Sequence, residues 1–239
     1  MMLSILRLIL GPVLLWQGAR VRRDILRLPE PSGKRSGQAG SGPALSVLLL
    51  GDSSIAGVGA ETQQEALSGK LSQLLAQTHQ VSWIMRGKTG WSTADALESI
   101  PDVSAGQTDV IVIALGVNDV TTETGIRTWL KTYSLLIQQL GAQFKPRLIV
   151  ISGLPEMGAF PALPWPLSWY MGMQAKAHET ALFQHFKAEP LVRILPLQFD
   201  LDASAMAEDG FHPGPQVYED WAVQIADLIT SELPETPAG

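Results

Sequence analysis

The sequence has 239 residues, of which 46% are hydrophobic and 17% charged, so it can bury the core of one domain. It has no cysteine, which excludes disulfides, thiolate metal sites and cysteine nucleophiles, and its four histidines argue against a histidine-rich metal site. Residues 1–35 hold seven basic and two acidic residues, a net +5, whereas residues 36–239 hold ten and 21, a net −11. We therefore expect no nucleic-acid partner.

The sequence of residues 1–30 predicts a helix whose first half is apolar and whose second half is rich in basic residues. The uncharged run Leu8–Ala19 has 12 residues, fewer than the roughly 18–20 that a membrane span needs. Arg7 interrupts the apolar stretch and three arginines follow it, which is atypical of a secretory signal. Three interpretations remain open: a helix at a membrane interface with Trp16 at the junction, a helix packed on the domain, or a span. We favour membrane association with a cytoplasmic body over secretion.

Residues 31–43 are rich in glycine and serine and predict a linker, followed by the main domain at residues 44–232 and a tail at 233–239. Within the domain, short apolar runs alternate with helical patterns. The runs span residues 44–51, 80–87, 108–116, 147–154 and 191–198; the helix candidates span 62–77, 92–100, 122–141, 168–187 and 215–232. This alternation predicts a parallel sheet of five strands covered by helices on both faces, a three-layer α/β domain.

Ligands bind at the carboxyl ends of the strands in such sheets. The first run ends in Gly-Asp-Ser, which makes Ser53 a candidate nucleophile at the start of the next helix. In the segment 209-DGFHPG-214, His212 is a candidate base, and Asp209, three residues earlier, can hydrogen-bond and orient the imidazole. Each of these residues would also suit an ordinary turn.

Two further strand ends carry candidate donors for an oxyanion. Asn118, in 116-GVND-119, has a neutral side-chain amide, and Gly90, in 87-GKTGWST-93, could offer its backbone N–H. Turn chemistry at Asn118 and helix entry at Gly90, with Ser92 or Thr93 as the cap, are the alternative interpretations.

In this order, the four segments resemble the four sequence blocks of the SGNH (GDSL-type) hydrolases, over about residues 44–232. The resemblance implies a flavodoxin-like sheet of order 2-1-3-4-5 and ester hydrolysis through an acyl-enzyme, without metal or cofactor. It implies Ser53 as nucleophile, His212 as general base and then acid, and Asp209 as its orienting partner. The oxyanion hole would combine the Ser53 and Gly90 amides with the Asn118 side chain.

The sequence departs from the family pattern at two places. Ser54 stands where many relatives carry leucine, which makes it a rival nucleophile to Ser53. The second block often begins with asparagine, whereas this neighbourhood reads Met85-Arg86-Gly87. Asp52 is expected to support the loop and to take no part in the chemistry.

The segment 154-LPEMGAFPALPWPLSWYMGM-173 is longer and more apolar than a simple connection requires. It predicts the wall of an apolar acyl pocket or a lid, formed by Phe160, Trp165, Trp169 and Tyr170. A flap packed on the core, or a second membrane-contacting patch, is the alternative.

These features predict a serine esterase or lipase-like hydrolase that acts on a small ester or a lipid, with a membrane surface contacted through residues 1–30. A thioesterase, a carbohydrate O-acetyl esterase and an acyltransferase use the same machinery and stay open. A catalytically silent, membrane-associated binding module is the alternative from another class. The sequence does not define the oligomeric state.

Overall fold

A six-stranded sheet forms the centre of the protein. The computed structural model describes residues 2–100, 108–197, 199 and 204–233, with side chains from residue 10 onward. The strands are β1 (Ser36–Ala39), β2 (Ala44–Gly51), β3 (Gln80–Gly87), β4 (Val110–Ala114), β5 (Leu148–Ser152) and β6 (Val192–Leu195). They lie in the order β1-β3-β2-β4-β5-β6; β2 to β6 are parallel, and β1 pairs antiparallel with β3.

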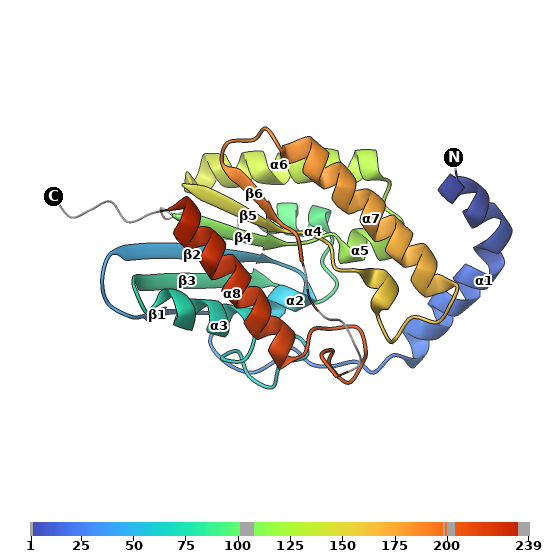
Figure 1. Ribbon diagram of the computed structural model, residues 1–239, viewed down its shortest axis with the longest axis horizontal. Coiled ribbons are helices and arrows are strands. Elements are labelled where there is room, and N and C mark those ends of the chain that lie inside the picture. Colours follow the sequence, from blue (N-terminus) through green and yellow to red (C-terminus); the bar gives the residue numbers. More distant parts are fainter. Residues whose placement is uncertain (1, 101–107, 198, 200–203, 234–239) are drawn as a thin grey trace.

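Helices cover both faces of the sheet (Figure 1). The helices are α1 (Met2–Asp24), α2 (Ser53–Ala56), α3 (Leu67–Leu75), α4 (Thr93–Ser99), α5 (Val117–Thr121), α6 (Ile126–Phe144), α7 (Leu167–Phe186) and α8 (Pro215–Glu232), with a short 3-10 helix, η2 (Met157–Ala159). Leu48 and Leu50 of β2 pack toward α4, α6 and α7, whereas Val47 and Leu49 pack toward α3 and α8. Both faces of the central strands are therefore buried, which explains their continuous apolar sequence.

The expected three-layer α/β fold is confirmed, and the five parallel strands follow the expected order 2-1-3-4-5. The expected number of strands was wrong, because β1 extends the sheet at the edge beside β3. This strand comes from residues 31–43, which were expected to be a linker. Its sequence, Ser-Gly-Gln-Ala, has no apolar alternation, and Gly37 lies so close to the Trp83 ring that a side chain there would crowd it.

From residue 10 onward, where its side chains are described, the N-terminal helix α1 contacts the domain through one side. Leu14 and Gln17 are buried, and Leu10 and Val21 pack partly against the core. The Gln17 side chain donates to the Trp165 carbonyl oxygen (2.9 Å) and accepts from the Leu167 N–H (3.1 Å), which fixes α1 at the start of α7. Within the described residues, no helix has both the length and the apolar character that crossing a membrane requires.

Candidate active site

The turn between β2 and α2 places Ser53 at the start of a helix, where it is largely buried. Gly51 ends the strand, and a Cβ atom there would lie 2.3 Å from the Ala114 carbonyl oxygen and 2.4 Å from Ile55 Cγ1. Only glycine fits this contact without displacing backbone. Asp52 is the N-cap residue of α2, and Ser53 is its first helical residue.

Asp52 stabilises this turn through Ser54. Its Oδ1 atom accepts hydrogen bonds from the Ser54 N–H (3.0 Å) and the Ser54 hydroxyl (2.8 Å). Burial raises the pKa of Asp52, although the two bonds from Ser54 act in the opposite direction. The Ser54 hydroxyl is thus engaged by Asp52.

The loop after β6 brings His212 to Ser53. Asp209 Oδ1 accepts from the backbone N–H groups of Phe211 (2.9 Å) and His212 (3.0 Å), which closes a tight turn. In this turn His212 Nδ1 lies 2.5 Å from Asp209 Oδ2, and His212 Nε2 lies 2.9 Å from Ser53 Oγ. The structure therefore joins Asp209, His212 and Ser53 in one hydrogen-bonded chain.

The charge on Asp209 determines the tautomer of His212. The Asp209 side chain is 1% exposed. Burial by itself raises its pKa, but the hydrogen bonds from the His212 ring and from two backbone N–H groups outweigh it and lower the pKa below the ordinary value. Asp209 is therefore a carboxylate at neutral pH, so it holds the proton of a neutral imidazole on Nδ1. Nε2 is then the acceptor for the Ser53 hydroxyl proton.

The expected oxyanion donors lie on three neighbouring strand ends. The Asn118 side chain of α5 donates one N–H to the Trp91 carbonyl oxygen (2.9 Å), which ties α5 to the loop that contains Gly90 and leaves a second N–H. Gly90 has a φ of 85°, a left-handed conformation. A Cβ atom placed on Gly90 would meet no other atom within 4 Å, so the space beside its backbone is open. Among the described residues, the N–H groups of Ser53 and Gly90 have no protein acceptor.

A buried network beneath these loops was missed at the level of sequence. Asp119 Oδ2 accepts from the Thr93 N–H (3.0 Å) and the Thr93 hydroxyl (2.8 Å), and the Trp129 indole N–H donates to the same hydroxyl (2.9 Å). Thr93 thus bridges α4, α5 and α6, while Ser92 is the helix cap. The adjacent Asn-Asp pair was the available signal, because two polar residues after a buried strand need partners. No cluster of three or more potential metal ligands occurs in the described part of the chain.

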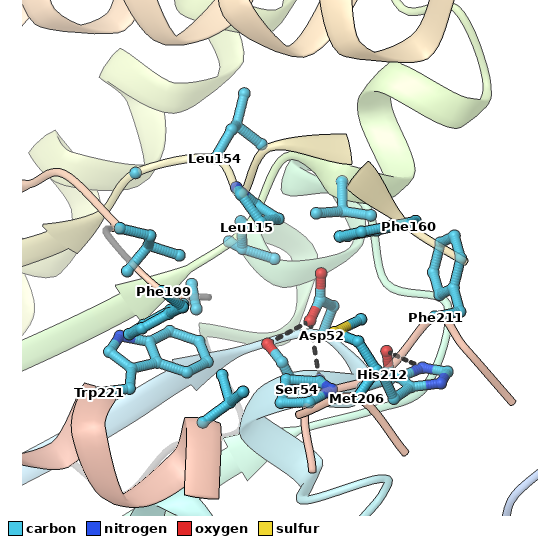
Figure 2. A pocket seen from close by; sticks show the side chains of 18 residues that line it. Asp52, Ser54, Leu115, Leu154, Phe160, Phe199, Met206, Phe211, His212 and Trp221 are labelled. Carbon is cyan, nitrogen blue, oxygen red and sulfur yellow. Dashed lines mark hydrogen bonds between the residues drawn. The ribbon is translucent and has the colours of Figure 1, made fainter. Parts of the chain in front are cut away.

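An apolar pocket opens beside Ser53 and His212 (Figure 2). Its empty space amounts to about 620 Å³, which includes space open to solvent. Its apolar lining comes from Ala114, Leu115, Val117, Leu154, Pro155, Phe160, Leu197, Phe199, Met206, Phe211, Pro213, Val217 and Trp221. Figure 2 shows Phe160 and Phe211 on one side and Phe199 and Trp221 on the other, with Asp52 between them.

Only one of the four expected pocket residues lines this pocket. Phe160 does so, in edge contact with Phe211 at 5.1 Å between ring centroids. Trp165 and Trp169 instead line a neighbouring surface hollow beside α7. Tyr170 is buried, and its hydroxyl lies 3.3 Å from Glu123 Oε1. These three residues therefore lie outside the lining of the pocket beside Ser53, and Trp169 and Tyr170 belong to α7, which begins at Leu167.

Several pocket residues were missed because they come from distant segments. Phe199 and Met206 follow β6, and Trp221 lies on α8. Phe211 offered a signal, since it lies between Asp209 and His212 in the segment already singled out. The others could not be assigned to a pocket without the packing of α8 on the sheet.

Comparison with known families completes the description of the site. A family model described as the GDSL-like lipase/acylhydrolase family matches residues 49–219. The chain belongs to the GDSL-like lipase/acylhydrolase family. The match includes Ser53, Asn118, Asp209 and His212 and places the chain, in general terms, among the ester hydrolases. The comparison with curated proteins gave no match.

Solved structures share the fold of this GDSL-like hydrolase. The lipase Lip_vut3 from a goat rumen metagenome is 19% identical with a TM-score of 0.57, and the match covers 77% of this chain and 96% of that one. The family 3 carbohydrate esterase of Clostridium thermocellum is 18% identical with a TM-score of 0.63, covering 80% and 97%. A family 2 carbohydrate esterase of Corynascus thermopiles is 13% identical with a TM-score of 0.61, covering 82% and 69%.

Proposed function

We propose that this hydrolase cleaves carboxylic esters through an acyl-enzyme on Ser53. The observation that carries the proposal is the continuous hydrogen-bonded chain Asp209–His212–Ser53 at the edge of an apolar pocket. A nucleophile, a base and a group that orients the base are what serine hydrolysis requires.

Acylation would begin when Ser53 Oγ attacks the ester carbonyl carbon and passes its proton to His212 Nε2. The carbonyl oxygen becomes an oxyanion, stabilised by the N–H groups of Ser53 and Gly90 and by the free N–H of Asn118. When the tetrahedral intermediate collapses, the bond to the alcohol oxygen breaks, and that oxygen takes the proton from His212. The alcohol leaves, and the acyl group remains bound to Ser53.

Deacylation would repeat these steps with water as the nucleophile. Water gives a proton to His212 Nε2 and attacks the acyl carbon, and the second intermediate then breaks its bond to Ser53 Oγ. The serine oxygen recovers the proton from His212, and the carboxylic acid leaves. Throughout, Asp209 remains ionised and stabilises the imidazolium form of His212.

The lining of the pocket favours esters with a hydrocarbon part. Thirteen apolar residues surround the space beside Ser53, so each methylene of a chain buried there should favour binding by about four-fold. Sugar O-acetyl esters, which the carbohydrate esterase neighbours suggest, would leave most of this apolar surface unused. A thioester could use the same pocket. The complete relay favours an enzyme over a silent binding module.

The proposal is tested with p-nitrophenyl esters of increasing acyl length. Wild type should hydrolyse them with kcat/KM rising from acetate to longer chains, and Ser53→Ala should lose several orders of magnitude of kcat. Ser54→Ala is the matched control and should keep most of the activity, because the Ser54 hydroxyl bonds to Asp52. Activity that survives in Ser53→Ala but disappears in Ser54→Ala would overturn the assignment.

A further inference from the structure

Helix α1 presents an exposed apolar and basic surface, at whose end Asp24 forms ion pairs with Arg20 (3.5 Å) and Arg23 (2.7 Å) and leaves Arg22 without an acidic partner among the described residues. Among the large apolar side chains of the described residues, the three most exposed are Trp165 (78%), Leu15 (69%) and Trp16 (62%). Trp165 lies beside α1, since its carbonyl oxygen accepts from Gln17. We use the name α1 surface for the exposed residues Val13, Leu15, Trp16, Arg20, Arg22, Arg23 and Trp165.

The α1 surface is held in a fixed position on the domain. Leu14 and Gln17 face the body and are buried, while Leu15 and Trp16 between them point outward. The two hydrogen bonds of Gln17 to backbone groups at Trp165 and Leu167 oppose rotation of the helix. The exposed side chains are therefore a stable feature of the folded protein.

The composition of the α1 surface matches that of a lipid interface. Indole rings prefer the boundary between hydrocarbon and water, and arginines beside them attract anionic headgroups. The Arg20 guanidinium lies 5.6 Å from the centre of the Trp16 ring, so charge and apolar surface are adjacent. Because residues 36–239 carry a net −11, the rest of the protein should be repelled by an anionic bilayer. The distribution of charge therefore favours α1 as the element that contacts the bilayer.

We propose that the α1 surface binds an anionic phospholipid bilayer as an interfacial helix. Figure 1 shows α1 beyond the end of the sheet toward which the parallel strands point, the end that also holds Ser53. The segment between β5 and α7 joins the two places, since Phe160 lines the pocket and Trp165 contacts α1. The bilayer would therefore lie on the side of the molecule where the active site lies.

This location also specifies a substrate class, an inference that rests on the proposed function. An apolar pocket that faces a lipid surface would receive an acyl chain from a membrane lipid or from its single-chain product. The esters preferred by the protein should then be acyl esters that partition into the bilayer.

Vesicle cosedimentation with full-length Ser53→Ala protein tests the membrane contact, because this variant cannot degrade the lipid. We expect binding to vesicles of equimolar phosphatidylcholine and phosphatidylglycerol, at least ten-fold weaker binding to phosphatidylcholine alone, and a Kd that rises with salt. Adding Arg22→Gln should weaken binding about five-fold, and adding Trp16→Ala should also weaken it. The matched controls Arg127→Gln and Leu135→Ala, both exposed on α6, should bind like the parent.

Absence of vesicle binding would overturn the membrane proposal, as would equal losses in the α1 and α6 variants. Light scattering that shows a dimer, dissociated by Trp16→Ala and unable to bind vesicles, would assign the surface to a second copy of the chain and also overturn it. Wild-type activity on soluble esters is measured without vesicles. Failure of the hydrolase assignment would therefore be distinguished from failure of the membrane contact.

Discussion

Ser53 and Ser54 are neighbours in sequence, but their hydroxyl groups have different partners. Ser53 Oγ lies 2.9 Å from His212 Nε2, whereas Ser54 Oγ donates to the buried carboxyl group of Asp52 at 2.8 Å. The residue before them separates the two roles, because Asp52 caps α2 through Ser54 and leaves Ser53 facing the base. The resemblance to the SGNH blocks favoured Ser53 over Ser54, but residue type alone could not distinguish the two serines, since both stand at the turn and both carry a hydroxyl group.

Asn118 tests the proposed oxyanion hole at the residue scale. Asn118→Ala should lower kcat by about 10²–10³-fold, because it removes a donor to the developing oxyanion. It also removes the bond to Trp91, so Asn118→Asp, which cannot donate, is made as a second variant. Steady-state kinetics should show similar losses in both variants with little change in KM. Near-normal kcat in both would contradict the assigned role.

Asp209 gives a prediction about stability and pH. Its folded-state pKa lies below the ordinary value of 3.8, so its carboxylate stabilises the fold above that pH, and the contribution is lost as pH falls through the lowered pKa. Asp209→Asn should therefore lower the free energy of unfolding at neutral pH, on the order of 1 kcal/mol. The difference from wild type should shrink below pH 3.8.

Urea unfolding at a series of pH values measures this difference. The control Asp227→Asn changes an exposed aspartate on α8 and should show no comparable dependence. A deficit of Asp209→Asn that stays constant down to the most acidic conditions would contradict the lowered pKa of Asp209.

At the scale of elements, two glycines should respond in opposite directions to the same substitution. Gly51→Ala places a Cβ atom 2.3 Å from the Ala114 carbonyl oxygen at the end of β2, which should cost about 3 kcal/mol of unfolding free energy. Gly141→Ala in α6 meets no atom within 4 Å and should stabilise the helix by up to about 1 kcal/mol. Urea midpoints of both variants provide the test, and equal stabilities would contradict the contact described at Gly51.

In the segment between β5 and α7, the sequence predicts an apolar wall but does not predict the direction in which each aromatic side chain points. The apolar and aromatic content of residues 154–173 predicted a pocket wall, and Phe160 of this segment lines the pocket beside Ser53. It could not place Trp165, Trp169 and Tyr170, because their directions depend on where α7 begins and on how it crosses the sheet. Helical periodicity gives relative positions around an axis, whereas the orientation of that axis comes from tertiary packing.

At the scale of the whole molecule, the alternation of buried strands and helices was sufficient to predict three layers and where along the chain the five parallel strands lie, whereas their order in the sheet came from the resemblance to the SGNH hydrolases. Strand β2 has the expected bounds, residues 44–51, since both of its faces are buried and every residue after Ala44 but one is apolar or glycine. The edge strand β1 was not predictable in this way, because four small residues at an edge need no apolar pattern. The separation of charge between residues 1–35 and the rest of the chain can be read from the sequence. The contact of α1 with α7 through Gln17 cannot, because it depends on tertiary packing.

The central claim, that Ser53 is the nucleophile, is tested most directly by labelling with an alkyl fluorophosphonate followed by mass spectrometry. The phosphorus electrophile reacts with an activated serine oxygen and releases fluoride, so the adduct identifies the attacking residue. We predict a single phosphonyl adduct on the Ser53 hydroxyl in wild type and in Ser54→Ala, and none in Ser53→Ala. An adduct mapped to Ser54, or labelling that persists in Ser53→Ala, would contradict the account.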